Sequence, residues 1–160
     1  MPRLAPDEVG GVNVAAFMDM LAVSEGTDDG RQKTHDDGYD VIVGGGLLDS
    51  YADHPRKLVN LPHYGIRSSA AGRYQFLRAT WDDLDARLGL PDFSPASQDR
   101  ACVELLKQCG ALALLQAGKF EEAMQAARKI WASLPGAGYG QHEQEFSDLR
   151  VAYVRFGGAA

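Results

Sequence analysis

Apolar residues recur at helical spacing along the stretch that follows Asn13. The positions of this stripe are Val14, Phe17, Met18, Leu21 and Ala22. Their spacing of i, i+3, i+4, i+7 and i+8 is typical of an amphipathic helix, which we expect to begin at Asn13, a helix-capping residue type, and to reach Ser24. One further step along the stripe is Glu25, which is followed by the helix-stopping Gly26. The pattern therefore predicts a carboxylate on the apolar face at the end of a helix.

Two effects act on a carboxyl group in that position. Partial burial disfavours its charged form, and the negative end of the helix dipole does the same, so both raise the pKa of Glu25. A carboxylic acid that stays protonated near neutral pH is suited to general acid catalysis. The alternative interpretation is an ordinary surface Glu at a frayed helix end, and position alone favours that interpretation.

The rest of the pattern predicts further helices and one small sheet. A strand is expected at residues 39–43, ended by the glycines at 44–46, with a returning strand or turn at 47–53. Irregular segments are expected at 54–69 and, because of its glycine content, at 134–141. Further helices are expected at residues 80–88, 95–109, 111–117, 120–131 and from 142 to about 156. These elements predict a mostly helical α+β fold.

The chain is expected to form one domain with a short arm before it. At 160 residues and 45% hydrophobic content it can bury one core, but it is too short for two domains of ordinary size. Residues 1–12 contain prolines and a Gly-Gly pair, and we expect a flexible arm there. Residues 13–160 then form the folded domain.

Composition argues against several classes of function. The formal net charge is −6 and no basic run is present, so a nucleic-acid partner is not expected. No apolar stretch of eighteen or more residues occurs, so no membrane insertion is expected. Residues 1–8 lack the apolar core of a signal peptide, and we expect the protein to stay in the cytoplasm unless something else releases it.

No metal or cofactor chemistry is indicated. The histidines, at positions 35, 54, 63 and 142, do not have metal-binding spacing, and no Gly-x-Ser-x-Gly elbow is present. Cys102 and Cys109 fall on a helix that Ser94 and Pro95 are expected to start. Seven residues of helix separate the two thiols by roughly 10 Å, so we expect two buried thiols and no disulfide. What remains is carboxylate chemistry centred on Glu25.

Several motifs, in order along the chain, resemble the lambda-type phage endolysins. The active-site segment of that family is similar to residues 24–34 (SEGTDDGRQKT). The other similar segments are 38–45 (GYDVIVGG), 53–59 (DHPRKLV), 71–75 (AGRYQ), 92–95 (DFSP) and 130–141 (IWASLPGAGYGQ). The resemblance extends over nearly the whole chain from Phe17 onward, with similar spacing.

The resemblance implies a lysozyme-like catalytic domain at residues 13–160, with a small antiparallel sheet and a substrate groove between loops at 55–69 and 134–141. Members of the family are lytic transglycosylases. They cut the β-1,4 bond between N-acetylmuramic acid and N-acetylglucosamine in bacterial peptidoglycan, and their product carries a 1,6-anhydro ring. The resemblance also implies a monomer without cofactors, held in the host cytoplasm until a holin-type lesion releases it to the periplasmic cell wall.

The resemblance assigns roles to individual residues. Glu25 is implied to be the single catalytic acid and base. Gln75 falls in an element similar to the Gly-x-x-Gln of other lytic transglycosylases, in which the Gln faces the sugar, and its amide can both donate and accept hydrogen bonds. The other residues implied to bind substrate are Tyr39, Asp40, Tyr74, Gly138, Tyr139 and Gln141. The structural alternatives are a solvent-facing Gln75 at a strand edge and a Tyr139 in a rigid turn packed on Trp131.

Two other functions are compatible with the sequence. A hydrolytic muramidase of the two-carboxylate kind needs a second acid at about 5–5.5 Å or 6.5–9.5 Å from the first. The candidates close to Glu25 in the sequence are Asp28, Asp29, Asp36, Asp37 and Asp40. A non-catalytic glycan-binding module would keep the groove but would not require an acid on an apolar helix face.

The chain also departs from the family pattern. The differences lie in the arm before Asn13, at residues 35–37, at Gly46 and at residues 62–67. We expect the 62–67 segment to affect which glycan subsites are favoured and how that lip of the groove moves. None of these differences involves Glu25.

Overall fold

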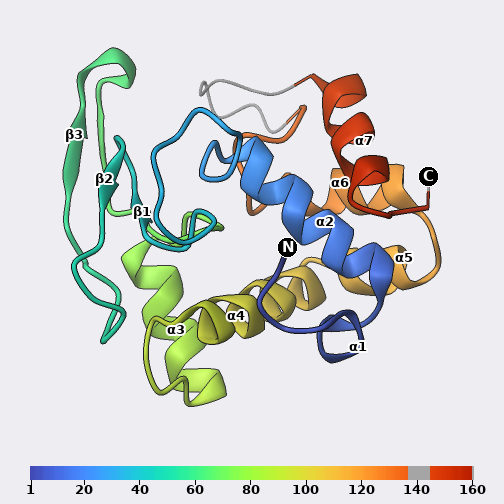
Figure 1. Ribbon diagram of the computed structural model, residues 1–160, viewed down its shortest axis with the longest axis horizontal. Helices are drawn as coiled ribbons and strands as arrows, with labels where there is room; N and C mark the ends of the chain where they lie inside the picture. Colours follow the sequence, from blue (N-terminus) through green and yellow to red (C-terminus); the bar gives the residue numbers. More distant parts are fainter. Residues whose placement is uncertain (137–144, 160) are drawn as a thin grey trace.

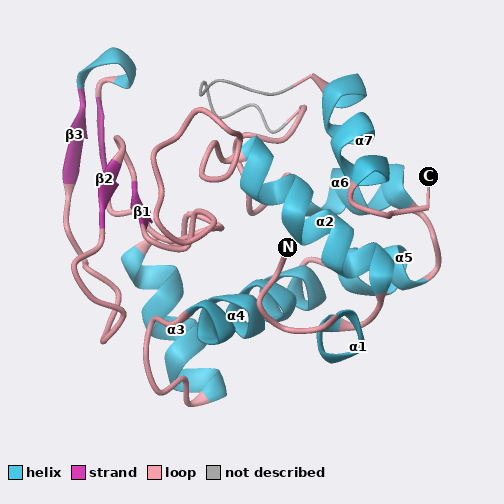
Figure 2. Cartoon of the chain, viewed as in Figure 1, coloured by secondary structure: helices cyan, strands magenta, loops and turns pink. Residues whose placement is uncertain are grey.

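The structure, a computed structural model, describes residues 1–136 and 145–159. The helices are α1 (Pro6–Val9), α2 (Val12–Ser24), α3 (Arg78–Leu88), α4 (Pro95–Gln108), α5 (Ala111–Gln116), α6 (Phe120–Ala127) and α7 (Phe146–Arg155). The strands are β1 (Val41–Ile42), β2 (Gly46–Leu47), β3 (Val59–Leu61) and β4 (Ile66–Ser68), with a 3-10 turn, η1 (Pro62–Tyr64), between the last two. The strands gather at one side of the molecule and most helices surround α2 at the other, with long loops between them (Figures 1 and 2). The predicted α+β, mostly helical fold is confirmed.

The strands form two separate antiparallel sheets, where the sequence pattern predicted one. In the first, β1 pairs with β2, with Val41 opposite Leu47. In the second, β3 and β4 form a hairpin closed by η1. The prediction of an irregular segment over residues 54–69 was wrong for this hairpin, because strands of three residues are too short to show a recognisable alternation of polar and apolar positions.

Helix α2 forms the centre of the core. It covers almost the predicted range and contacts α1, α5 and α7. The predicted amphipathic pattern is incomplete, because side chains outside the stripe are buried as well. These additional buried residues are Ala15, Ala16, Asp19, Met20 and Ser24. A helix that neighbouring elements cover on several sides does not need a polar face.

Asn13 does not cap α2, which corrects the predicted helix start. The N-cap residue is Gly11, where no side-chain hydrogen bond is made. The Asn13 side chain instead donates to the carbonyl of Leu115 at 3.1 Å and accepts from the amide of Ala159 at 3.0 Å. It therefore joins α2 to α5 and to the segment that follows α7.

Helix α4 begins as predicted. The Ser94 hydroxyl accepts a hydrogen bond from the Ser97 amide at 3.4 Å, and Pro95 occupies the first turn. Both thiols are free, as expected: Cys102 is buried, whereas Cys109, just after the helix, is only half-buried.

Other helices differ from the prediction at their ends. Helix α3 begins at Arg78 instead of residue 80, and α6 ends at Ala127, before the predicted residue 131. The start predicted for the last helix, at His142, lies outside the described residues, and α7 is described from Phe146. No described helix combines the length and the apolar character needed to cross a membrane.

Residues 1–12, for which the sequence predicted a flexible arm, make specific contacts with the core. The amides of Arg3 and Leu4 donate to Oδ2 of Asp99 at 2.7 and 2.9 Å. Val9, at the end of α1, is buried in the main core. Prolines and glycines in the arm predicted mobility, but the acceptor that orders it lies 96 residues from Arg3 in the sequence.

Asp99 is a fully buried carboxylate that accepts four hydrogen bonds. Besides the two amides of the arm, the hydroxyls of Tyr39 and Tyr74 donate to Oδ1, each at 2.7 Å. Burial and the adjacent carboxylate raise the pKa of Tyr39, so its hydroxyl remains a donor. Asp99, on α4, thereby connects this helix to the arm, to the segment before β1 and to the segment before α3.

Replacing Asp99 by Ala should lower the free energy of unfolding by about 3–5 kcal/mol, because two buried hydroxyls and two half-buried amides would lose their acceptor. Urea unfolding followed by circular dichroism measures the change. The matched control is Asp83→Ala on α3. The exposed Asp83 carboxylate pairs with Arg87 at 2.8 Å, and removing it should lower the free energy of unfolding by no more than about 0.5 kcal/mol. Equal losses in the two variants would contradict the role assigned to Asp99.

Candidate active site

A cavity of about 380 Å³ opens between the end of α2, the β3–β4 hairpin and the chain that follows α6. Its polar wall is formed by Ser24, Glu25, Ser68, Gln75 and Ser133. Its apolar wall is formed by Val43, Leu61, Tyr64, Ile66, Leu77 and Ile130. The cavity therefore surrounds a carboxyl group with both polar and apolar side chains.

Glu25 is the residue that directly follows α2, as its position in the sequence predicted. Its amide donates to the Leu21 carbonyl at 2.8 Å, so the last helical turn holds its backbone. Its side chain is half-buried in the cavity wall, where the Ser133 hydroxyl donates to Oε1 at 2.6 Å. The Ser24 hydroxyl lies 2.8 Å from the Ser133 hydroxyl and completes a chain of three polar groups.

The surroundings of Glu25 favour its protonated form. The pKa of this carboxyl is raised from 4.5 to about 7. Burial is the larger influence and raises the pKa, whereas the hydrogen bond from Ser133 lowers it, because that bond stabilises the charged form. The direction of the shift agrees with the sequence prediction. Ser133 was not singled out from the sequence, although it lies within the 130–141 motif that carried the resemblance.

Gln75 lies in the same cavity wall as Glu25. Its backbone has a φ of +53°, a left-handed conformation that is strained for a residue with a side chain. Its side-chain Nε2 donates to the Gly72 carbonyl at 2.9 Å, which holds the amide across its own turn. Gln75 is half-buried and lines the cavity.

The turn that carries Gln75 requires glycine at its start. Gly72 has a φ of +81°, and a Cβ there would lie 2.3 Å from Oε1 of Gln98. That same Oε1 accepts from the Arg73 amide at 2.9 Å. Because Gly72 has no side chain, Gln98 of α4 can come close enough to accept the hydrogen bond from the backbone of the turn.

Two further hydrogen bonds fix the turn between the active-site segments. The Thr27 hydroxyl donates to the Arg73 carbonyl at 2.6 Å, and the indole Nε1 of Trp131 donates to the Tyr74 carbonyl at 3.0 Å. Thr27 directly follows the Glu25-Gly26 pair, and Trp131 precedes Ser133 by two residues. These two bonds therefore fix the turn to the loop that follows Glu25 and to the segment that carries Ser133.

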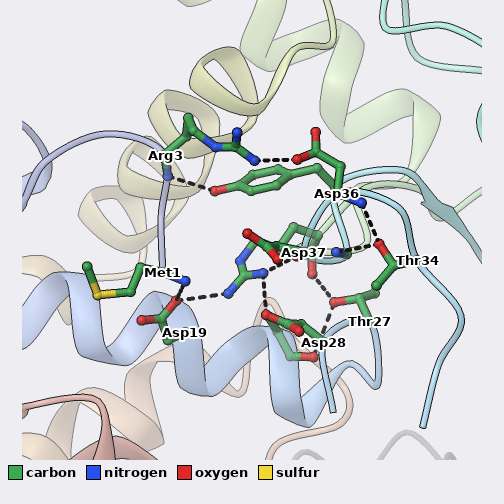
Figure 3. A network of polar contacts seen from close by, with 12 residues as sticks. Met1, Arg3, Asp19, Thr27, Asp28, Thr34, Asp36 and Asp37 are labelled. Atoms are coloured by element: carbon green, nitrogen blue, oxygen red, sulfur yellow. Dashed lines mark hydrogen bonds and ion pairs between the residues drawn. The ribbon is translucent and has the colours of Figure 1, made fainter. Parts of the chain in front are cut away.

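The Arg73 side chain extends from this turn into a buried ion-pair network. Its guanidinium donates to Asp19 on α2 at 2.8 Å and to Asp28 at 2.7 Å, and also to the Asp37 carbonyl. Asp19, Asp28 and Thr27 are labelled in the view of this network in Figure 3. The Asp28 carboxylate is thus engaged in the structural network.

The other aspartates near Glu25 in the sequence also have structural partners. Asp29 accepts from the amides of residues 31 and 32, Asp36 from the side chains of residues 3 and 51, and Asp40 from the Thr34 hydroxyl and the amide of residue 35. Asp37 has a φ of +50° and contributes its carbonyl to the network. Among the described residues that line the cavity, Glu25 is the one carboxylate.

Six further residues were implied to bind substrate. Tyr39 and Tyr74 are fully buried and bonded to Asp99, and Asp40 is buried with its carboxylate bonded within the 34–40 loop, so the structure does not place these three in the cavity wall. The physical reason is that each polar group finds a partner inside the core. The others, Gly138, Tyr139 and Gln141, lie outside the described residues. No group of His, Cys, Asp or Glu in the described parts of the chain has an arrangement that could hold a metal ion.

Comparisons with known proteins identify relatives that cover most of the chain. The endolysin family model matches residues 15–160. The chain is 52% identical over 143 residues to the endolysin of Escherichia phage lambda, covering 89% of this chain and 90% of that protein. It is 46% identical over 155 residues to the endolysin of Escherichia phage P2, covering 91% and 93%.

Two solved structures match the fold closely. Bacteriophage lambda lysozyme complexed with a chitohexasaccharide has a TM-score of 0.89 and 47% sequence identity, and the match covers 100% of this chain and 99% of that one. Lysozyme from bacteriophage lambda has a TM-score of 0.86 and 49% identity, covering 94% and 97%. The lysozyme-like fold is thereby confirmed, and the chain belongs to the endolysin family of lysozyme-type glycosidases.

Proposed function

We propose that this endolysin is a lytic transglycosylase, which cuts the bond between N-acetylmuramic acid and N-acetylglucosamine and forms a 1,6-anhydro product. The observation that carries the proposal is that Glu25 is the one carboxylate among the described residues of the cavity wall. A transglycosylase needs one acid and base because the nucleophile belongs to the substrate. A two-carboxylate hydrolase needs a second acid at a defined separation.

In the proposed reaction, Glu25 performs both proton transfers. Since its pKa is raised to about 7, a large share of Glu25 is protonated at neutral pH, and this form donates its proton to the glycosidic oxygen as the bond from that oxygen to C1 of the muramoyl residue breaks. The 6-hydroxyl of the same muramoyl residue then attacks C1, and its proton passes to the Glu25 carboxylate. Because Ser133 donates to Oε1, we assign the transferable proton to Oε2. The tethered hydroxyl reacts at a high effective concentration, so no water is needed.

The substrate assignment draws on the polar wall of the cavity and on the relatives. Gln75 can both donate to and accept from acetamido and hydroxyl groups, and we propose that it orients the sugar beside Glu25. Lambda lysozyme is known in complex with a chitohexasaccharide, a strand of linked N-acetylhexosamines. Monomeric action on the periplasmic wall after holin-dependent release from the host cytoplasm is part of the same proposal and follows the resemblance to phage endolysins.

Glu25→Gln should reduce lysis of purified cell walls by at least about 100-fold, because the amide cannot transfer a proton while the side chain keeps its shape. The loss of turbidity of a wall suspension measures the rate, and circular dichroism confirms the fold. The matched control is Glu122→Gln on α6, where the exposed carboxylate pairs with Lys119 at 3.3 Å; its activity should equal that of the parent. Activity of the Glu25 variant within tenfold of the parent would remove Glu25 from the mechanism.

The pH dependence should report the protonation of Glu25. Since the acid must be protonated, the rate should fall as pH rises through about 7. Ser133→Ala removes a hydrogen bond that stabilises the carboxylate, so the pKa of Glu25 rises and the falling limb moves to higher pH. Ser68→Ala, another serine of the cavity wall, is the control and should leave the limb in place. A limb that moves to lower pH in the Ser133 variant would contradict this assignment.

The products distinguish the transglycosylase from a hydrolytic muramidase. Digestion of purified peptidoglycan should release muropeptides that are lighter by one water than hydrolysis products and that borohydride does not reduce, because the anhydro ring leaves no free reducing end. Mass spectrometry before and after reduction measures both properties. Reducible muramic acid ends would establish hydrolysis instead, and unchanged wall would indicate a binding module.

A further inference from the structure

The β3–β4 hairpin has an apolar face that turns toward the active site. Leu61 and Ile66 are paired across the two strands, and both line the cavity that holds Glu25. The next pair, Asn60 and Arg67, lies on the opposite face, because successive residues of a strand alternate between faces. An apolar strand face that would ordinarily cover a core therefore forms a cavity wall here.

The tip of this hairpin has a defined backbone that presents Tyr64. Pro62, whose ring restricts φ, begins the 3-10 turn, and Gly65 ends it in a left-handed conformation with a φ of 64°. The Gly65 amide donates to the Pro62 carbonyl at 3.2 Å. Tyr64 is the last residue of this turn, and its side chain reaches the cavity although 50% of its surface is exposed.

Tyr64 belongs to a set of exposed apolar side chains around the cavity. Ile66, Leu77 and Ile130 line the same space and are 38%, 49% and 39% exposed. Exposed apolar side chains gathered around one cavity with a few polar groups are typical of a ligand-binding site. The second aromatic residue in the described cavity wall, Trp131, is 3% exposed and donates its indole proton to the backbone, so it is part of the core.

The substrate offers a matching surface. In a β-1,4-linked N-acetylhexosamine the hydroxyl, acetamido and linking oxygens project from the edge of the ring, whereas C–H bonds cover its two faces. A tyrosine ring is a flat apolar surface with a hydroxyl at one end, and such a ring can stack on a pyranose face while its hydroxyl remains in water. Glu25 and Gln75, which line the same cavity, would meet the polar edge of the strand.

We propose that Tyr64 is a specificity-determining residue that stacks on the face of one pyranose ring of the glycan strand, at the edge of the Glu25 cavity. This inference rests on the proposed glycan substrate, but it does not depend on whether the bond is cut by transglycosylation or hydrolysis. Stacking adds affinity for the strand and leaves the proton transfers of Glu25 unaffected.

Binding of chitohexaose to the Glu25→Gln protein, measured by isothermal titration calorimetry, tests the proposal without turnover. Adding Tyr64→Ala should weaken binding roughly 2- to 10-fold, the scale of an aromatic stacking contact. Adding Tyr64→Phe should leave binding within about twofold of the Glu25→Gln parent, because the stacking surface remains. In the otherwise native protein, Tyr64→Ala should raise KM for soluble glycan strands with little change in kcat.

The matched control is His63→Ala, which changes an exposed neighbour in the same turn that does not line the cavity. It should bind as the parent does, and thermal unfolding should show equal stability for all variants. Unchanged binding in the Tyr64→Ala variant, or equal losses in the Ala and Phe variants, would overturn the stacking role while leaving the proposed function intact. No binding of chitohexaose by the Glu25→Gln parent would instead overturn the glycan substrate, and the stacking proposal with it.

Discussion

The buried guanidinium of Arg73 holds together the segments that form the candidate active site. It pairs with Asp19 on α2 and with Asp28 in the loop that follows that helix. A buried ion pair depends on all its members, and removing one of them typically costs about 3–5 kcal/mol. Because Arg73 belongs to the turn that carries Gln75, the ion pairs also place this turn beside the end of α2. Glu25 and Gln75 share one cavity as a consequence.

The cavity lining comes from segments that are held in different ways. Glu25 follows α2, and Gln75 lies in a turn that is bonded to three other segments, so both are held by well-packed backbone. A short hairpin, with Tyr64 at its tip, contributes part of the apolar lining. The neighbouring aspartates bond elsewhere, so burial is the main influence on the pKa of Glu25. This mixed lining matches the polar edges and apolar faces of the glycan strand that we propose as the substrate.

Local sequence patterns were sufficient for the features that depend on neighbours along the chain. The spacing of apolar residues located α2 and placed Glu25 at its end, and Ser94 with Pro95 located the start of α4. These features follow from helical periodicity and from hydrogen bonds between residues three positions apart. The order of motifs was enough to identify the family and therefore the lysozyme-like fold.

Tertiary structure alone decided which distant groups meet. Ser133 lies 108 residues from Glu25 in the sequence, yet it donates the hydrogen bond that acts on the pKa of that carboxyl. Asp99 orders an arm whose composition predicted flexibility, and it holds Tyr39 in the core, although the resemblance assigned that residue to the substrate. A residue type states which hydrogen bonds a side chain can make, but the partner is chosen by the packing of segments that are remote in the chain. The short β3–β4 hairpin was missed for the same reason, because three-residue strands are stabilised by their pairing and not by a local preference.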